Sequence, residues 1–313
     1  MQLFDLPHED ARRALDAGAP VYLSINPVEY HGPHLPLHND AIVSAGLIRD
    51  VHRKVRARHP DWPLLVGADL EIGVEPTPGP GSRFTSLPIA RSLVREACRA
   101  LAELGARRVV LMTFHCAPLH NIAIEVGVDE LRSRGVAAVA PFNLLTRQLL
   151  GVEDAAMYAP AFDHIDDARE RDEMLRTLHL DFHGGFFETS MTLHYAPDSV
   201  GDHRSLPPCP TIVPRIGLRA AASIARSTGA SQLAKELELA AFALGWHALQ
   251  PFPGYTGKPH LARAQSGAFF AEKIVERFAR AIDDVFEGRA RSPEPIMAWT
   301  AKLTLDGRIS PTA

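Results

Sequence analysis

The sequence predicts an α/β fold with a mostly parallel sheet and helices on both faces. Short apolar runs of strand length alternate with longer segments of helical spacing through the first half of the chain. Glycine or proline stands at several segment boundaries. The chain has 313 residues, 46% of them hydrophobic, which is enough for one large core. Because no convincing linker or repeat interrupts this pattern, we expect a single domain over residues 1–313.

Four apolar runs have the length of strands and lie between helical segments or turn residues. They are residues 21–25, 64–66, 108–114 and 136–139. The helical segments between them are long enough to carry the chain back across the sheet. We therefore expect consecutive strands to be connected by helical crossovers, which favours parallel pairing.

Six segments carry apolar residues at helical spacing. They are residues 8–17, 39–56, 88–104, 121–134, 231–248 and 260–286. Gly18, Gly105 and Gly135 end the first, third and fourth of them. Asn39 and Asp40 suit the N-terminal cap of the second. Two polar regions remain: residues 151–180, expected to be an insertion or lid over the site, and a tail from about residue 288, expected to end in a short strand.

Composition excludes several classes of function. A net charge of −4 and a pI near 6.4 do not suit a nucleic-acid-binding surface. The longest uncharged apolar stretch, residues 239–249, is shorter than the roughly 20 residues that a membrane span needs. The three cysteines are far apart and odd in number, which argues against a disulfide framework. With no secretion signal at the start, we expect a cytoplasmic protein with no nucleic-acid or membrane partner.

Ionisable side chains gather in three segments at the predicted carboxyl edge of the sheet, where ligands bind in α/β folds. Glu29 and His31 follow the strand at residues 21–25, and Asp40 begins the next helix. His115 follows the strand at residues 108–114, and Glu188 lies in a glycine-containing segment. Together they have the ligand count for two divalent ions.

A carboxylate has two oxygens, so Asp40 could bridge the two ions. One ion would take Glu29, Asp40 and His115, and the other would take His31, Asp40 and Glu188. Imidazole and carboxylate ligands suit Zn or Mn, with Fe as a further candidate. Taken singly, each residue has an ordinary explanation: Asp40 as a helix cap, Glu188 as a solvated side chain, and a histidine after a strand as a surface residue. Their convergence on one edge is what favours a metal site.

The motifs around these residues resemble the creatininase family of metal-dependent amidohydrolases. The first is Glu-x-His-Gly-x-His-Leu-Pro followed by Asp, here residues 29–36 with Asp40. The second is an apolar strand that ends at His115. The third is His-Gly-Gly, a short gap and Glu-Thr-Ser, here residues 183–190. The match extends over most of residues 20–285, including glycine-rich motifs at 254–259 and 264–267.

The resemblance implies a three-layer α/β/α sandwich, two metal ions per chain and hydrolysis of a C–N bond in a small cyclic or linear amide by metal-activated water. It carries over Glu29, His31, Asp40, His115 and Glu188 as metal ligands. It makes His183 the candidate catalytic residue, a proton shuttle, because the imidazole pKa lies near operating pH. It also implies a homo-oligomer, commonly a hexamer, that acts on a small-molecule amide.

The chain departs from the family pattern at two positions. True creatininases carry Glu two residues after the second-motif histidine, where this chain has Ala117, and Lys258 replaces an Asp. We therefore do not expect creatinine itself as the substrate. Four loop residues are weaker candidates to line the substrate pocket, namely Arg83, Phe84, Phe186 and Phe187. Four others are weaker candidates to support the ligands, namely His34, Cys116, His120 and Asn121.

Two alternative functions remain open at this stage. The altered loop after His115 is compatible with a binding or scaffold protein that has lost turnover. The metals are also compatible with another hydrolysis, such as deformylation or release of a peptide from a maturing cofactor.

Overall fold

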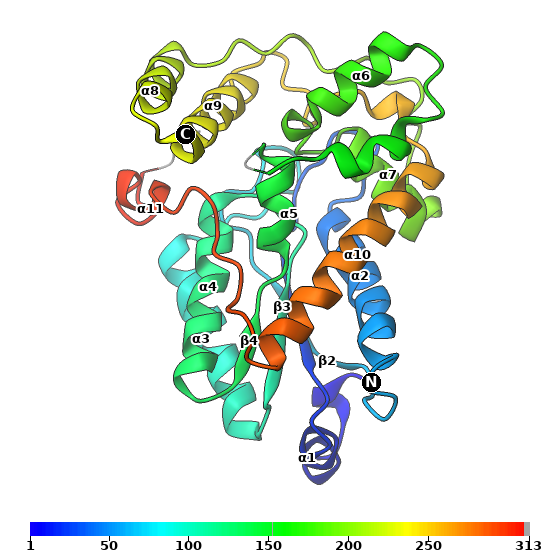
Figure 1. Cartoon of the computed structure of the whole chain (residues 1–313), viewed down its shortest axis with the longest axis vertical. Helices are drawn as coiled ribbons and strands as arrows, with labels where there is room; N and C mark the ends of the chain where they lie inside the picture. Colours follow the sequence, from blue (N-terminus) through cyan, green and yellow to red (C-terminus); the bar gives the residue numbers. More distant parts are fainter. Residues whose placement is uncertain (152, 310–313) are drawn as a thin grey trace.

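Four parallel strands form one sheet in the order β2-β1-β3-β4 (Figure 1). The computed structural model describes residues 1–151 and 153–309. The strands are β1 (Val21–Asn26), β2 (Leu65–Glu71), β3 (Arg108–Met112) and β4 (Ala137–Val139). Val21 of β1 pairs with Leu65 on one side and with Val109 on the other. All three strand pairings are parallel, which confirms the predicted α/β class.

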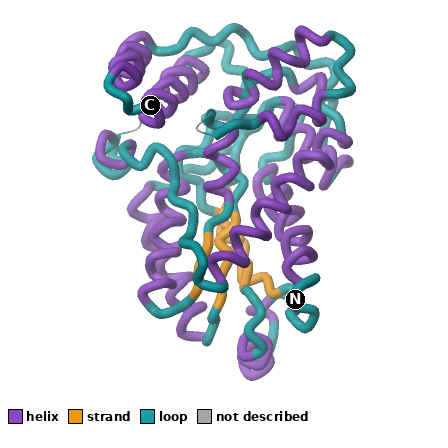
Figure 2. Tube along the Cα trace, viewed as in Figure 1, coloured by secondary structure: helices purple, strands orange, loops and turns teal. Residues whose placement is uncertain are grey.

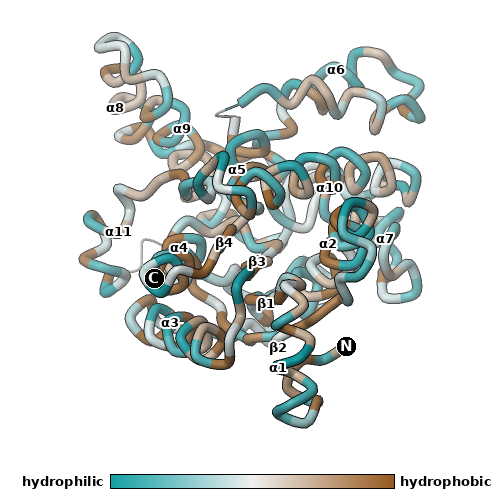
Figure 3. The backbone as a smooth tube through the Cα atoms, turned by 60° about the horizontal axis from the view of Figure 1, so that its bottom comes forward, coloured by the Kyte–Doolittle hydropathy of each residue, from teal (hydrophilic) through white to brown (hydrophobic). Residues whose placement is uncertain are grey.

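The sheet separates two hydrophobic cores, because successive side chains of a strand point to opposite faces. On β1, Tyr22 belongs to one core, while Val21 and Leu23 belong to the other. On β3, Val110 and Val109 divide in the same way. In Figures 2 and 3 the strands lie between two layers of helices. The molecule therefore has the three layers that the family resemblance implied.

Helices α3 (Leu87–Leu104) and α4 (Pro118–Ser133) pack together on one face of the sheet, with α1 (His8–Asp16) in the same core. The other face is covered by α2 (Asn39–Arg56), α5 (Phe142–Leu149), α7 (Phe186–Tyr195) and α10 (Ala264–Phe286). Three more helices lie beyond the carboxyl edge: α6 (Ala168–Arg176), α8 (Ile216–Ser227) and α9 (Ser231–Trp246). None of the helices within the described ranges combines the length and apolarity that crossing a bilayer requires.

All six predicted helices form, with ends shifted by up to four residues. Four other helices were missed: α5, α7, α8 and, in the C-terminal tail, a short α11 (Thr300–Leu303). Helix α7 was missed because it begins directly after two glycines, which on sequence alone indicate a loop. The predicted insertion at 151–180 forms α6 and two 3-10 helices, Ala156–Phe162 and Leu178–Leu180. Positions 152 and 310–313 lie outside the described residues.

The tail prediction is wrong in its last part. No strand forms in the described portion of the tail, up to residue 309; instead it forms a short helix, α11 (Thr300–Leu303). This segment does not reach an edge of the sheet. It packs against α4 and against the region of α9, on the left in Figure 1.

The strand order reverses between β1 and β3, and this position determines where a ligand can bind. The connection after β1 leads to β2 on one side, while β3 continues the sheet on the other side. The loops that follow β1 and β3 therefore separate and leave a crevice at their carboxyl ends. Glu29 and His31 follow β1, and His115 follows β3, so all three side chains reach this crevice.

Asn26, at the end of β1, fixes the geometry of that crevice. Its side-chain oxygen accepts hydrogen bonds from the Phe114 amide at 2.9 Å, from Ser44 at 3.0 Å and from Thr113 at 3.3 Å. One buried amide thus joins the ends of β1 and β3 to helix α2. His115 follows Phe114 directly, so its backbone position depends on this contact.

The close packing of α3 on α4 gives a test of the fold. A Cβ atom at Gly127 would lie 2.7 Å from both Cys98 Sγ and Val94 Cγ1. We expect Gly127→Ala to lower the free energy of unfolding by about 1–3 kcal/mol through overpacking. Gly217, in α8, has no atom within 4 Å of the equivalent position. Gly217→Ala is expected to be neutral or to stabilise by up to about 1 kcal/mol through helix propensity. Urea denaturation measures both, and equal effects would contradict the observed packing.

Candidate metal centre

The five predicted ligands meet at one point above the sheet. They come from the loop after β1, the first turn of α2, the loop after β3 and the first turn of α7: Glu29, His31, Asp40, His115 and Glu188. Each is at most 5% exposed. The two carboxylates on helices lie in first turns, where the helix dipole favours negative charge. Three stretches distant in sequence therefore supply one buried cluster.

Asp40 stands between two groups of side chains. Its Oδ1 lies 3.1 Å from His31 Nε2, and its Oδ2 lies 3.5 Å from His115 Nδ1. Glu188 Oε2 lies 3.5 Å from His31 Nε2, while Glu29 Oε2 lies 2.9 Å from His115 Nδ1. Among the described residues, ligand atoms within 4.8 Å of one another form the groups Glu29–Asp40–His115, His31–Asp40–Glu188 and Glu29–His31–His183. The first two are the groups expected from the sequence, with Asp40 in both; the third was not expected.

Both imidazoles are oriented by backbone carbonyls. His31 Nδ1 lies 3.1 Å from the carbonyl oxygen of Glu29, and His115 Nε2 lies 3.1 Å from that of Val74. When each of these nitrogens carries the hydrogen and donates to the carbonyl, the other nitrogen faces the carboxylates with its lone pair. This is the usual arrangement of metal-binding histidines, whose second nitrogen is held by a backbone or carboxylate oxygen.

Several polar atoms of the cluster are buried and have no hydrogen-bond partner. They are Glu29 Oε2, His31 Nε2 and both carboxylate oxygens of Asp40. Leaving such groups unpaired in a protein interior is costly, so they point to a partner of another kind. A divalent cation accepts the lone pairs of all these atoms at once. The residues present therefore fit a metal site.

The protonation equilibria show the same need for positive charge. Burial alone would lower the pKa of His31, but Asp40 and Glu188 outweigh it and raise that pKa to about 10. Burial also opposes protonation of His115, yet Glu29 raises its pKa to about 9. For Glu188, burial raises the pKa to about 8. The three carboxylates therefore favour positive charge in the cluster, either as protons on the two imidazoles or as bound metal ions.

His183 lies beside the cluster, with its ring stacked on His31 at 4.2 Å. Its Nε2 is 2.9 Å from the carbonyl oxygen of Tyr30. An N–H at this position donates to the carbonyl and leaves Nδ1 bare, 3.9 Å from Glu29 Oε1 and 3.5 Å from Thr77 Oγ1. Burial, together with the charge of His31, lowers the pKa of His183 to about 3, so the imidazole is neutral. His183 Nδ1 therefore faces the site as an acceptor within reach of the Thr77 hydroxyl, and its pKa lies well below the operating pH on which the sequence prediction relied.

The loop that carries His183 needs glycine next to it. Gly184 has a φ of +56°, and a Cβ atom there would lie 3.0 Å from the backbone oxygen of His31. Its amide donates to Glu188 Oε2 at 2.6 Å. The close approach of this loop to the first motif thus fixes both His183 and Glu188.

The four residues expected to support the ligands lie around the cluster. His34 Nε2 is 2.8 Å from Thr189 Oγ1, next to Glu188. The Asn121 side-chain amide donates to the carbonyl of His115, and the His120 ring packs edge-on against His115 at 4.9 Å. Cys116 lines the cavity beside the site; burial and the nearby carboxylates raise its pKa well above the usual value. A thiol in this environment stays protonated and is not a nucleophile.

The four residues expected to line the substrate pocket are placed elsewhere, which corrects that prediction. Phe84 is 65% exposed, and Arg83 forms an exposed ion pair with Glu71. Phe186 and Phe187 are fully buried and stack on other core aromatic rings. These two rings turn inward because they lie on helix α7, whose buried face was not recognised in the sequence.

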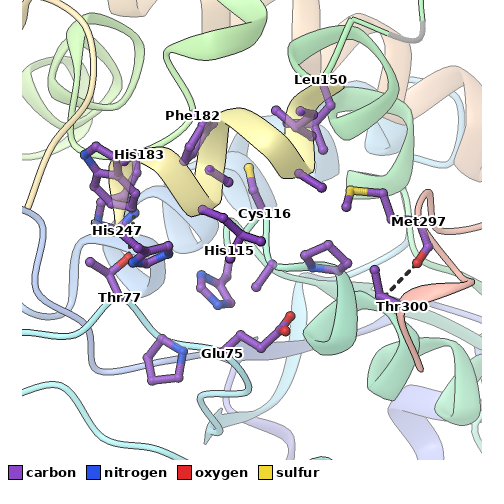
Figure 4. Close-up of a pocket in the computed structure, with 18 of the residues that line it drawn as sticks. Glu75, Thr77, His115, Cys116, Leu150, Phe182, His183, His247, Met297 and Thr300 are labelled. Carbon is purple, nitrogen blue, oxygen red and sulfur yellow. Dashed lines mark hydrogen bonds between the residues drawn. The ribbon is translucent and has the colours of Figure 1, made fainter. Parts of the chain in front are cut away.

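A cavity of about 330 Å³ opens from the cluster and is lined by residues that sequence reasoning missed (Figure 4). Among them are Glu75, Thr77, Trp246 and His247. Of these four residues, only Trp246 and His247 have a sequence signal, since an indole and an imidazole are adjacent near the end of a predicted helix. No described residue between 153 and 180 lines this cavity, although that region was expected to cover the site.

Comparison with known proteins agrees with this geometry. A family model described as creatinine amidohydrolase matches residues 5–282. The chain belongs to the creatininase family of amidohydrolases. A curated creatinine amidohydrolase from Pseudomonas putida is 28% identical over 189 residues, which are 57% of this chain and 65% of that protein. The aligned part is thus slightly under two thirds of that relative.

Solved structures of creatininases share the fold. One described as creatinine amidohydrolase (creatininase) is 22% identical with a TM-score of 0.58, covering 90% of this chain and 96% of that chain. A creatininase described with Mn and a mutant creatininase of the Zn-Zn type are each 20% identical with a TM-score of 0.59. Both comparisons cover 91% of this chain and 99% of the other. At these identities the likeness shows the α/β fold.

The crowding of carboxylates predicts a gain in stability when one is neutralised. With chelator present, we expect Glu188→Gln to raise the free energy of unfolding by about 1–2 kcal/mol. Burial raises the pKa of Glu188 to about 8, so at neutral pH this carboxyl must take up a proton on folding, and glutamine removes that cost. The Gln oxygen can still accept from the Gly184 amide. Glu272→Gln, at an exposed position of α10, should change stability by less than about 0.5 kcal/mol. If Glu188→Gln instead lowers the free energy of unfolding, the charges of the metal-free cluster are already compensated within the protein.

Proposed function

We propose that this chain is a metal-dependent hydrolase that cleaves the C–N bond of an amide with two divalent ions. The observation that carries this proposal is the position of Asp40, whose two oxygens face two separate groups of buried ligand atoms. The ligands would be Glu29 and His115 for one ion and His31 and Glu188 for the other, with Asp40 shared. Membership of the creatininase family supports the reaction class.

The donor set suits Zn or Mn, because it combines imidazole nitrogen with carboxylate oxygen. The Zn-Zn and Mn forms of related structures favour the same metals. When bound, such ions polarise a carbonyl and lower the pKa of water. All further chemistry in this proposal is assigned to the chain's own residues.

His183 is the proposed proton shuttle. Its Nδ1 faces the cluster, while Nε2 is held by the carbonyl of Tyr30, so the ring keeps one orientation and one tautomer. Water adds to the amide carbon and gives one proton to Nδ1. That proton passes to the leaving nitrogen as the C–N bond breaks. The products are a carboxylic acid, which retains the second proton of the water, and an amine; proton transfer between them gives a carboxylate and an ammonium group, with no oxidant or further reactant consumed.

The two departures from the family pattern leave the substrate open. Ala117, where creatininases carry Glu, lines the cavity with a methyl group. Lys258, where the family has Asp, forms ion pairs with Glu170 at 2.9 Å and Glu173 at 3.6 Å and so holds its loop against α6. Neither residue offers the group expected at that position, which supports a substrate other than creatinine.

A cytoplasmic homo-oligomer remains part of the proposal. Apolar side chains at Val213, Ile216 and Ile224, on and before α8, are more than 60% exposed, which suits contact with a second copy. The three cysteines are free thiols, as a reducing compartment allows. Sedimentation velocity gives the number of subunits, for which the family resemblance implies six.

Loss of the shared carboxylate is the direct test of the metal site. In protein loaded with Zn or Mn, we expect Asp40→Asn to lose at least one bound ion and to lower kcat/KM on a panel of amides by at least about 10³-fold. Metal per chain by mass spectrometry and product formation measure this. His38→Ala is the matched control, because His38 lies in the same motif but is exposed and 62% accessible at its side chain. Metal binding without hydrolysis of any amide would favour the scaffold alternative.

His183 is tested separately from the ligands, because its Nδ1 also lies near Glu29 and His31. We expect His183→Ala to keep the full metal content and to lose about 10²–10⁴-fold in kcat. If this variant instead loses an ion, His183 is a ligand and the proton shuttle must be another group.

A further inference from the structure

The cavity beside the cluster is continuous with it. Glu29, His115 and Glu188 belong to its lining, together with residues of helix α9 and of the segment 297–309. Figure 4 shows His115 and His183 beside this space. Its volume of about 330 Å³ lies at the lower end of the range for small-molecule sites. A substrate whose carbonyl reaches the cluster must place its remaining atoms in this space.

The walls away from the cluster are apolar. Phe182 contributes from the segment before α7, Leu239 and Leu244 from α9, and Met297 and Leu303 from the C-terminal segment. Figure 4 shows Phe182, Leu150 and Met297 around the same space. These side chains come from regions distant in sequence, so the apolar lining is a product of the fold.

Several polar groups in these walls already have partners in the protein, whereas His247 Nδ1, which also belongs to the lining, is buried without one. Trp246 Nε1 donates to the carbonyl of Tyr255 at 2.9 Å, and Trp299 Nε1 donates to Glu236 at 2.7 Å. The Thr300 hydroxyl donates to a backbone oxygen at 2.7 Å, drawn as a dashed line in Figure 4. The indoles and the threonine therefore present ring and methyl surface to a ligand. Next to the indoles and Thr300, a polar group of the substrate would lose its water without gaining a hydrogen bond.

The charge of the lining is one-sided. Its described residues include no Arg or Lys, whereas Glu75 adds a carboxylate to those of Glu29 and Glu188. Glu75 Oε2 accepts from the amide of Leu119 at 3.1 Å, which holds it at the start of α4. A carboxylate or phosphate on the substrate would find no cation in these walls.

We propose that the substrate is an uncharged amide or lactam that carries a bulky apolar group, such as an alkyl chain or an aryl ring, held between α9 and the C-terminal segment. This inference rests on the proposed amidohydrolase function. A small polar ring such as creatinine would leave the apolar part of the cavity unfilled. Burial of each added methylene is expected to improve binding about fourfold until the cavity is full.

The experiment uses the full-length, metal-loaded protein and a series of straight-chain hydroxamic acids from acetyl to octanoyl, with benzohydroxamic acid. The hydroxamate group anchors to metal, so calorimetry reports how the tail fits even without turnover. The expected result is a Kd that falls about fourfold per methylene over the first members of the series. A chain of equal length that ends in a carboxylate should bind at least tenfold more weakly than its methyl-ended counterpart.

Substitutions in the cavity wall test whether the alkyl chain of the hydroxamate binds in this cavity. Ala243→Phe and, as a milder change, Ala240→Leu place larger side chains into the wall formed by α9. Each should reduce the affinity ratio between the longest and shortest hydroxamate, by at least tenfold for Ala243→Phe. Ala100→Phe, at an exposed position of α3 away from the cavity, should leave the ratio as it is. The same ratio of kcat/KM is then measured on matched alkyl amides.

The outcomes separate the two proposals. Chain-length dependence of binding without hydrolysis supports the apolar cavity and contradicts the hydrolase. Hydrolysis with equal rates for short and long amides supports the hydrolase and overturns the apolar-substrate inference. Preference for the carboxylate-ended chain also overturns it. Failure to bind metal overturns both.

Discussion

Three carboxylates buried within a few ångströms of one another form the constraint on which this structure depends. Such a cluster is unfavourable without positive charge. Two imidazoles, His31 and His115, face it and are each oriented by a backbone carbonyl, while the third, His183, is neutral. Two helix first turns offset part of the cost, because their dipoles favour Asp40 and Glu188. The remaining imbalance is what a divalent cation would remove. The buried carboxylates thus lower the stability of the folded protein, which is the usual cost of a functional site.

The rest of the architecture holds these groups in place. The change of strand order at β1 and β3 opens the crevice, and the Asn26 side chain joins the strand ends to α2. Gly184 allows the third segment to approach the first closely enough for His183 to stack on His31. Each contact is short-range, yet together they link residues more than 150 positions apart in sequence.

The sequence predicted the candidate metal centre because its signals are local. Glu29, His31 and Asp40 lie within twelve residues, and His115 directly follows an apolar strand. The substrate cavity was not predictable in this way. Its wall combines α9 with a tail that was expected to form a strand, and only tertiary packing brings the two together. Phe186 and Phe187 were misplaced for a related reason: an aromatic pair after glycines has no periodicity to reveal a short buried helix.

The position of Trp299 has a consequence for how specificity changes in this family. The family model ends at residue 282, so the whole C-terminal wall, including the indole bonded to Glu236, lies outside the part that matches. Part of the proposed substrate wall therefore lies outside the stretch that carries the candidate ligands, whereas α9 and Phe182 lie inside it. In the proposed hydrolase, changes confined to the terminal residues alter the cavity and leave every candidate ligand where it is.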